Sequence, residues 1–152
     1  MFYEDFPIGR VTELGSTAFT RESIESYAQR FDPRVLSRAA GERPLVASGL
    51  HVASAAMRRL LETRAALRAA MAARGQTLPE LGVSPGFREM RWPHPVQEGD
   101  VVSFSMETIS KRETSKPNWG LIGNRFRGVN QRGEEVLVFS SVVLVARRGE
   151  EI

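Results

Sequence analysis

The stretch SGLHVASAAMRRLLETRAALRAAMAARG, residues 48–75, decides the fold. Alanine, leucine, methionine and arginine dominate it, and neither glycine nor proline interrupts residues 50–74. Ser48 suits an N-cap and Gly75 the residue just past a C-terminus, so the sequence predicts one long helix over 49–74. The apolar residues occupy two neighbouring helical rows, Val52, Ala56, Leu60 and Ala53, Met57, Leu61. We expect this broad face of mostly small side chains to lie close against a sheet.

The second half of the sequence follows a strand period instead. Val102, Phe104 and Met106 alternate with polar residues, which is typical of a half-buried strand. Residues 119–129 and 135–147 predict two further strands, joined as a hairpin by the turn-forming residues 130–133. The last of these segments is apolar on both faces, so we expect it to be buried on both sides.

Residues ahead of the long helix predict a strand, a short helix and a loop. The strand covers residues 9–16, and Thr20 caps a helix that runs to about Arg30 and ends before Asp32-Pro33. Residues 34–44 show no sustained period and predict a loop. The order of elements predicts an α+β fold, a curved antiparallel sheet wrapped around one long central helix. With 152 residues, the chain predicts a single domain over 1–152.

Composition narrows the function classes. The 41% hydrophobic and 26% charged residues are typical of a soluble globular protein, and no apolar run approaches the length of about 20 residues that spans a bilayer. The N-terminus lacks a signal-peptide pattern, which predicts a cytoplasmic location. Without cysteine, and with two histidines in no ligand spacing, we expect no metal site. The arginines are scattered and the net charge is only +3, which argues against nucleic-acid binding and favours, at most, a small phosphorylated ligand.

Five short motifs occur in an order that resembles one known family. They are Tyr3-Glu4-Asp5-Phe6 with Gly9; Phe31-Asp32-Pro33; Ala47-Ser48-Gly49-Leu50-His51; Arg91-Trp92 with Pro95-Val96 and Gly99-Asp100; and Asn130-Gln131-Arg132-Gly133. Together they make nearly the whole chain resemble a MaoC-like dehydratase domain. The resemblance implies a hotdog fold and a dimer whose sheets join edge to edge. It also implies a groove at the dimer interface for an acyl thioester of coenzyme A or acyl carrier protein, with coenzyme A present only as part of the substrate and no separate cofactor.

The resemblance also implies a catalytic loop, and this sequence departs from it. In the (R)-specific enoyl-CoA hydratases of the family, an aspartate and a histidine five residues later act as general base and acid. Asp32 occupies the aspartate position, but Ser37 stands where the histidine is expected, and Arg34 replaces the usual asparagine. Serine has no basic group near neutral pH. Either Asp32 orients water alone or another residue has taken over the proton transfer.

The two histidines and the start of the long helix are the remaining candidates. His51 lies in the first helical turn and is a candidate for the proton transfer. The alternative is a structural role, as a partly buried histidine bonded to the backbone. His94 stands between two prolines, and its alternative is an exposed loop residue. By resemblance, the Gly49 amide binds the thioester carbonyl, and the glycine lets that oxygen approach closely. The alternative for Gly49 is a place in an ordinary capped helix start without a ligand. The alternative for Asp32 is a turn residue without a catalytic role.

The resemblance therefore implies a hydratase or dehydratase that adds or removes water at the β-carbon of acyl-CoA or acyl-carrier-protein thioesters. The predicted catalytic residues are Asp32, Ser37 and His51, and the predicted substrate-binding residues are Arg34, Ser48 and Gly49. One alternative is a noncatalytic thioester-binding hotdog protein, or the inactive subunit of a mixed dimer with a MaoC-like partner. A thioesterase is a less favoured alternative. The expected assembly is a homodimer or a larger homo-oligomer.

Overall fold

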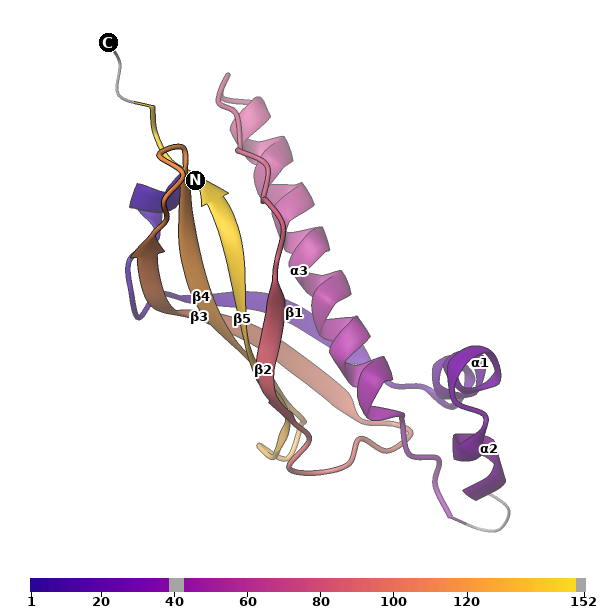
Figure 1. Ribbon diagram of the computed structural model, residues 1–152. Helices are drawn as coiled ribbons and strands as arrows, with labels where there is room; N and C mark the ends of the chain where they lie inside the picture. The colour runs from indigo at the N-terminus through magenta and orange to yellow at the C-terminus, as the bar shows by residue number, and fades with distance from the viewer. Residues whose placement is uncertain (39–42, 150–152) are drawn as a thin grey trace.

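The computed structural model describes residues 1–38 and 43–149. Its elements are, in chain order, the 3-10 turn η1 (Tyr3–Asp5), β1 (Val11–Ala18), α1 (Arg21–Phe31), α2 (Arg34–Arg38), α3 (Gly49–Ala72), β2 (Gly86–Arg91), β3 (Val101–Glu113), β4 (Trp119–Val129) and β5 (Glu135–Ala146). The strands form an antiparallel sheet in the order β1-β3-β4-β5-β2. Figure 1 shows the sheet curving around α3, with α1 and α2 beside the start of that helix. The predicted α+β architecture is confirmed.

The core forms where the inner face of the sheet meets α3. Val102 and Phe104 of β3 are buried while Ser103 between them is exposed, as the predicted alternation requires. Phe126 of β4 and Phe139 of β5 stack with their ring centroids 4.7 Å apart. Val52 and Ala56 of α3 belong to the same cluster. The apolar face of α3 and the inner face of the sheet therefore form one apolar layer.

The predicted broad apolar face of α3 is confirmed for the first row and for Ala53, which pack in or against the core, and was wrong for Met57 and Leu61. Val52 and Ala56 are buried, but the Met57 and Leu61 side chains are 44% and 59% exposed. These two residues border a cavity rather than the packed core. The turns beyond Glu62 are mostly exposed, as predicted. Among the described residues, no helix combines the length and the apolar composition needed to cross a membrane.

The segment that leads to α3 agrees with the prediction only in part. The Thr20 hydroxyl accepts a hydrogen bond from Ser23 N at 3.1 Å and caps α1, as predicted. The predicted loop was wrong at its beginning, because residues 34–38 form α2, which starts with a bond from Val35 N to the Asp32 carbonyl at 3.2 Å. A single helical turn has too few residues to show a period. Residues 39–42 of the predicted loop lie outside the described residues.

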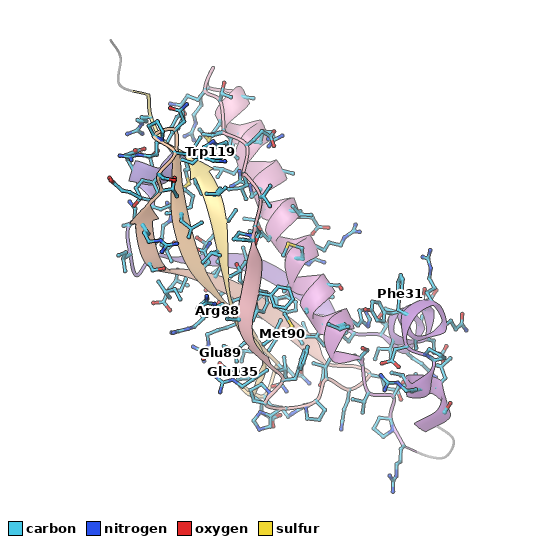
Figure 2. All side chains as sticks on the ribbon, viewed as in Figure 1. Phe31, Arg88, Glu89, Met90, Trp119 and Glu135 are labelled. Carbon is cyan, nitrogen blue, oxygen red and sulfur yellow. The ribbon has the colours of Figure 1, made fainter. Side chains whose placement is uncertain are left out.

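Strand β2 was not predicted, and β1 begins and ends two residues later than expected. β2 pairs only with β5 at one edge of the sheet, and Figure 2 shows Arg88, Glu89 and Met90 along it. An edge strand with charged residues lacks the apolar alternation by which strands are recognised. In β1, a bulge between Glu13 and Gly15 shifts the register with β3, and the pairing continues past the predicted end to Ala18.

Candidate active site

The first turn of α3 presents backbone N–H groups that no side chain caps. Ser48 occupies the predicted N-cap position, but its hydroxyl makes no capping hydrogen bond. The first bond of the helix joins Val52 N to Ser48 O at 3.2 Å. The amides of Gly49, Leu50 and His51 therefore have no recorded backbone acceptor in the described part of the chain. Together with the positive end of the helix dipole, they favour an anionic or carbonyl oxygen at this position.

Trp92 explains why residue 49 is a glycine. A Cβ atom on Gly49 would stand 2.6 Å from Cε2 of the Trp92 indole. The indole Nε1–H also donates a hydrogen bond to the Gly49 carbonyl oxygen at 2.8 Å. This contact fixes the start of α3 to the segment that follows β2. The contact gives a second reason for the glycine; the close approach of a ligand oxygen and the role of the Gly49 amide stay predictions.

Asp32 is paired with Arg34 and lies near Ser48, the N-cap residue of α3. Its carboxylate accepts hydrogen bonds from Arg34, Nε to Oδ1 at 2.9 Å and Nη2 to Oδ2 at 3.3 Å. The Arg34 guanidinium, and more weakly the Ser48 hydroxyl, hold the pKa of this carboxyl below its ordinary value. The Arg34 side chain is 76% exposed, so water screens the ion pair. The structure thus brings Asp32, Arg34 and Ser48 together, with Asp32 ionised at neutral pH.

His51 faces α1 rather than Asp32. Its imidazole stacks on the Tyr27 ring, with centroids 4.5 Å apart and planes 3° from parallel, and meets Phe19 edge-on at 5.1 Å. The Nδ1 atom is buried and has no hydrogen-bond partner among the described residues. Burial lowers the pKa of the imidazole, which favours the neutral form. The expected alternative, a partly buried histidine, is therefore observed, but aromatic rings hold it instead of a backbone hydrogen bond.

The remaining predicted residues, Ser37 and His94, make no recorded contact with the Asp32 carboxylate in the described part of the chain. Ser37 is an exposed residue of α2, and its predicted catalytic role has no recorded contact to support it. His94 Nδ1 lies 3.0 Å from the Glu135 carbonyl oxygen, and Nε2 lies 3.8 Å from Glu134. These contacts place His94 at the β4–β5 turn and agree with the exposed-loop alternative. Across residues 1–38 and 43–149, no cluster of three or more His, Asp or Glu side chains forms a candidate metal site.

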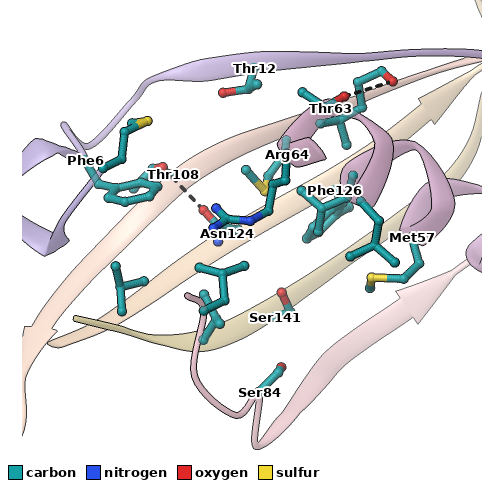
Figure 3. Close-up of a pocket in the computed structure, with 18 of the residues that line it drawn as sticks. Phe6, Thr12, Met57, Thr63, Arg64, Ser84, Thr108, Asn124, Phe126 and Ser141 are labelled. Atoms are coloured by element: carbon teal, nitrogen blue, oxygen red, sulfur yellow. Dashed lines mark hydrogen bonds between the residues drawn. The ribbon is translucent and has the colours of Figure 1, made fainter. Parts of the chain in front are cut away.

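A cavity of about 260 Å³ lies under the second half of α3, between the helix and the sheet (Figure 3). Apolar side chains make up most of its lining, with Arg64 and Asn124 among the polar exceptions. The lining begins on α3 at Met57, about 12 Å along the helix from Gly49, and includes Arg64, about 22 Å from it. Sequence reasoning missed this cavity, because residues from α3 and several strands meet there only after folding. It also missed the Gly49–Trp92 contact, although both residues belong to recognised motifs.

Comparisons with known proteins were made by sequence and by structure. No family model matches the sequence. A mesaconyl-CoA hydratase from Cereibacter sphaeroides is 35% identical over 78 residues, which cover 49% of this chain and 23% of that protein. The crystal structure of a MaoC-like dehydratase from Rhodospirillum rubrum matches 98% of this chain and 99% of its own, with a TM-score of 0.77 and 24% identity. A Mycobacterium tuberculosis protein described as a double hotdog fold matches all of this chain and 46% of its own, with a TM-score of 0.73 and 17% identity.

These similarities define the class of fold. The chain has the hotdog fold, as its motifs predicted. More particularly, its architecture is that of the MaoC-like dehydratases, which confirms the predicted resemblance at the level of the fold. The matched segment spans less than a quarter of the mesaconyl-CoA hydratase, so the match does not show that this chain acts on the same substrate.

Proposed function

We propose that this protein is a hydratase or dehydratase of acyl thioesters of coenzyme A or acyl carrier protein. One observation carries the proposal: Asp32 is an ionised carboxylate within reach of the Ser48 hydroxyl, and Ser48 is the N-cap residue of α3, whose first amides no side chain caps. The carboxylate is a proton acceptor and the amides are an oxyanion site, and hydration of a conjugated thioester requires both. The names of the related proteins, a mesaconyl-CoA hydratase and a MaoC-like dehydratase, support the same chemistry.

In the proposed reaction, the thioester carbonyl oxygen accepts a hydrogen bond from the Gly49 amide. Asp32 takes a proton from water while the water oxygen bonds to the β-carbon, and the electron pair of the double bond moves onto the carbonyl oxygen as an enolate. The carboxyl group then returns its proton to the α-carbon. Dehydration follows the same steps in reverse. This route uses one carboxylate for both transfers and needs no histidine.

The other predicted site residues receive supporting roles in this proposal. Ser48 positions Asp32 through its hydroxyl. Arg34 holds both carboxylate oxygens in the free protein and releases one of them to the attacking water. His51 keeps α1 packed against α3 through Tyr27, and so positions Asp32, which ends α1. Ser37 contacts the substrate from α2.

We further propose that residues 1–152 form one hotdog domain that works in the cytoplasm as a homodimer. β2 lies at the edge of the sheet, with Phe87 62% exposed and Trp92, just beyond its end, 40% exposed. A second copy adding its own β2 at this edge extends the sheet and covers both rings. Two hotdog units in one chain, as in the Mycobacterium tuberculosis protein, support this arrangement.

The test is the hydration of crotonyl-CoA, followed as the loss of absorbance of the conjugated thioester. The proposal predicts turnover by the purified protein, and 3-hydroxybutyryl-CoA as the product. Longer trans-2-enoyl-CoA substrates extend the test to other acyl chains. Absence of turnover with every chain length overturns the hydratase proposal for these substrates.

A noncatalytic thioester-binding protein is the second candidate function. Two observations favour it: Arg34 occupies both oxygens of Asp32, and neither His51 nor His94 makes a described contact with that carboxylate. Such a protein binds alone or as the inactive subunit of a mixed dimer with a MaoC-like partner. Binding of the unreactive butyryl-CoA without turnover of crotonyl-CoA would support it. Hydrolysis of butyryl-CoA would instead support the thioesterase alternative.

A further inference from the structure

A hollow of about 780 Å³ lies on the outer face of the sheet, the face that points away from α3. Its lining comes from β2, β5, β4 and β3, and its volume is that of a small-molecule site. Phe126 and Phe139 point into the core on the inner face, so their neighbours along β4 and β5 point outward. The sheet therefore separates this hollow from α3 and from the candidate active site at the start of that helix.

Small residues form the floor of the hollow. The pairing register places four residues side by side across the strands, in the order Gly86, Val142, Gly123 and Ser110. Two of them have no side chain and a third has only a hydroxymethyl group, so the backbone of the sheet is poorly covered along this row. Such a floor lets a flat ring lie against the sheet, with Leu121 and Val142 as apolar contacts.

The next row on one side of the floor is positively charged. Arg88, Ser140 and Arg125 stand side by side there, on β2, β5 and β4. Neighbouring strands lie about 4.8 Å apart, so the two arginines flank the serine with their Cα atoms about 10 Å from each other. Both guanidinium groups can therefore reach one anion above the serine hydroxyl.

The two arginines of this row lack partners within the described part of the chain. Arg127, two residues along β4, pairs with Glu135 at 2.6 Å. The side chains of Arg88 and Arg125 make neither an ion pair nor a hydrogen bond with residues 1–38 or 43–149, although Glu107 stands opposite Arg125 on β3. The lining of the hollow itself has three basic residues and no aspartate or glutamate. Charge complementarity therefore favours an anionic ligand.

We propose that this hollow binds a nucleoside phosphate, at a site separate from the proposed hydratase chemistry. The phosphate accepts hydrogen bonds from Arg88, Arg125 and the Ser140 hydroxyl, and the base lies on the floor over Gly123. Gly123 is two residues from Arg125 along β4, a distance of about 7 Å, which leaves room for one ribose between the base and the phosphate. The proposed homodimer keeps the hollow open, since pairing at β2 uses backbone groups and the Arg88 side chain points out of the sheet.

Calorimetric titration with AMP tests the proposal, with adenosine and inorganic phosphate as the two halves of the ligand. The wild type is expected to bind AMP more tightly than either half. Arg88→Gln and Arg125→Gln are each expected to weaken AMP binding about tenfold or more, since a hydrogen bond from a charged group is lost. Arg74→Gln removes the same charge beyond the end of α3 and is the matched control, with AMP binding expected to stay unchanged.

Ser140→Glu tests the same row without removing an arginine. The new carboxylate stands between Arg88 and Arg125 and pairs with them, so AMP binding is expected to be lost. Opposite charges on adjacent strands stabilise a sheet, so the free energy of unfolding in urea is expected to stay the same or to rise. This variant separates loss of the site from loss of the fold.

A free nucleotide and the nucleotide part of coenzyme A share this chemistry, and two thioesters distinguish them. Displacement of AMP by butyryl-CoA, but not by butyryl-pantetheine, assigns the hollow to the nucleotide part of coenzyme A. Retention of AMP with both thioesters assigns the hollow to a free nucleotide.

Four outcomes overturn the proposal. In the first, the wild type does not bind AMP. In the second, inorganic phosphate binds as tightly as AMP, which shows a simple anion site. In the third, Arg74→Gln weakens AMP binding as much as Arg88→Gln, which shows a general charge effect. In the fourth, butyryl-pantetheine displaces AMP, which makes the hollow part of the thioester site. None of these measurements depends on turnover, so the proposal and the hydratase activity fail or hold separately.

Discussion

Replacement of Gly49 by alanine tests the packing that fixes the start of α3. The new Cβ would stand 2.6 to 3.0 Å from three atoms of the Trp92 indole, so the ring must move. Overpacking of this kind costs about 1 to 3 kcal/mol. The displaced ring also loses its hydrogen bond to the Gly49 carbonyl, a further loss of about 1 kcal/mol. Alanine returns at most about 1 kcal/mol through its helix propensity, so we expect the free energy of unfolding to fall by about 1 to 3 kcal/mol.

Urea unfolding measures this loss, and a Trp92→Ala background isolates its cause. Trp92→Ala removes the three atoms nearest to the new Cβ, so we expect Gly49→Ala to be neutral or slightly stabilising there. The difference between the two backgrounds is the interaction energy of the pair. An equal loss in both backgrounds would refute the assignment of the cost to the Trp92 contact.

Three further predictions concern Asp32, His51 and β2. Arg34→Asn removes the main cause of the low Asp32 pKa, so we expect the acid limb of the pH–rate profile to move to higher pH. We also expect the hydration rate to rise, by less than about tenfold. An unchanged pH–rate profile would contradict this prediction. Burial lowers the pKa of His51, so below about pH 6.5 the unfolded chain binds more protons than the folded protein does. The free energy of unfolding should therefore fall as the pH drops through that value. His51→Phe, which keeps the stack on Tyr27, should reduce this dependence in urea unfolding between about pH 5 and 6.5, and an identical dependence in both proteins would exclude His51 as its source. Glu89 in β2 has a φ of 54°, a left-handed backbone conformation that strains residues other than glycine. Glu89→Gly should therefore raise the free energy of unfolding by up to about 1 kcal/mol, whereas Glu89→Val should lower it. The reverse order would show that the backbone at residue 89 is not strained.

The main elements of the fold could be predicted because their residues carry a period. The long helix and the β4–β5 hairpin were predicted to within about two residues, since α3 has a buried row and β4 and β5 are apolar. β2 and α2 have no such signal: β2 is a charged edge strand, and α2 is a turn of five residues. The exposure of Met57 and Leu61 depends on the cavity beneath α3, which no local pattern records.

The candidate site could be predicted as a set of residues but not as a geometry. The motifs identified Asp32, Ser48 and Gly49, and the structure brings them together at the start of α3. The Arg34–Asp32 ion pair and the stacking of His51 on Tyr27 depend on where α1 and α2 lie relative to α3. These positions follow from tertiary packing, so sequence spacing alone could not show which groups reach the carboxylate.

The central claim is that Asp32 transfers the protons of a hydration reaction. The most direct test compares the rate of crotonyl-CoA hydration by the wild type and by Asp32→Ala, with butyryl-CoA binding measured in parallel. We predict that the substitution lowers the hydration rate by about 10² to 10⁴ and changes butyryl-CoA affinity little, since acid–base catalysis contributes on this scale. A substituted protein that hydrates crotonyl-CoA as fast as the wild type would contradict the assignment of Asp32 as the base.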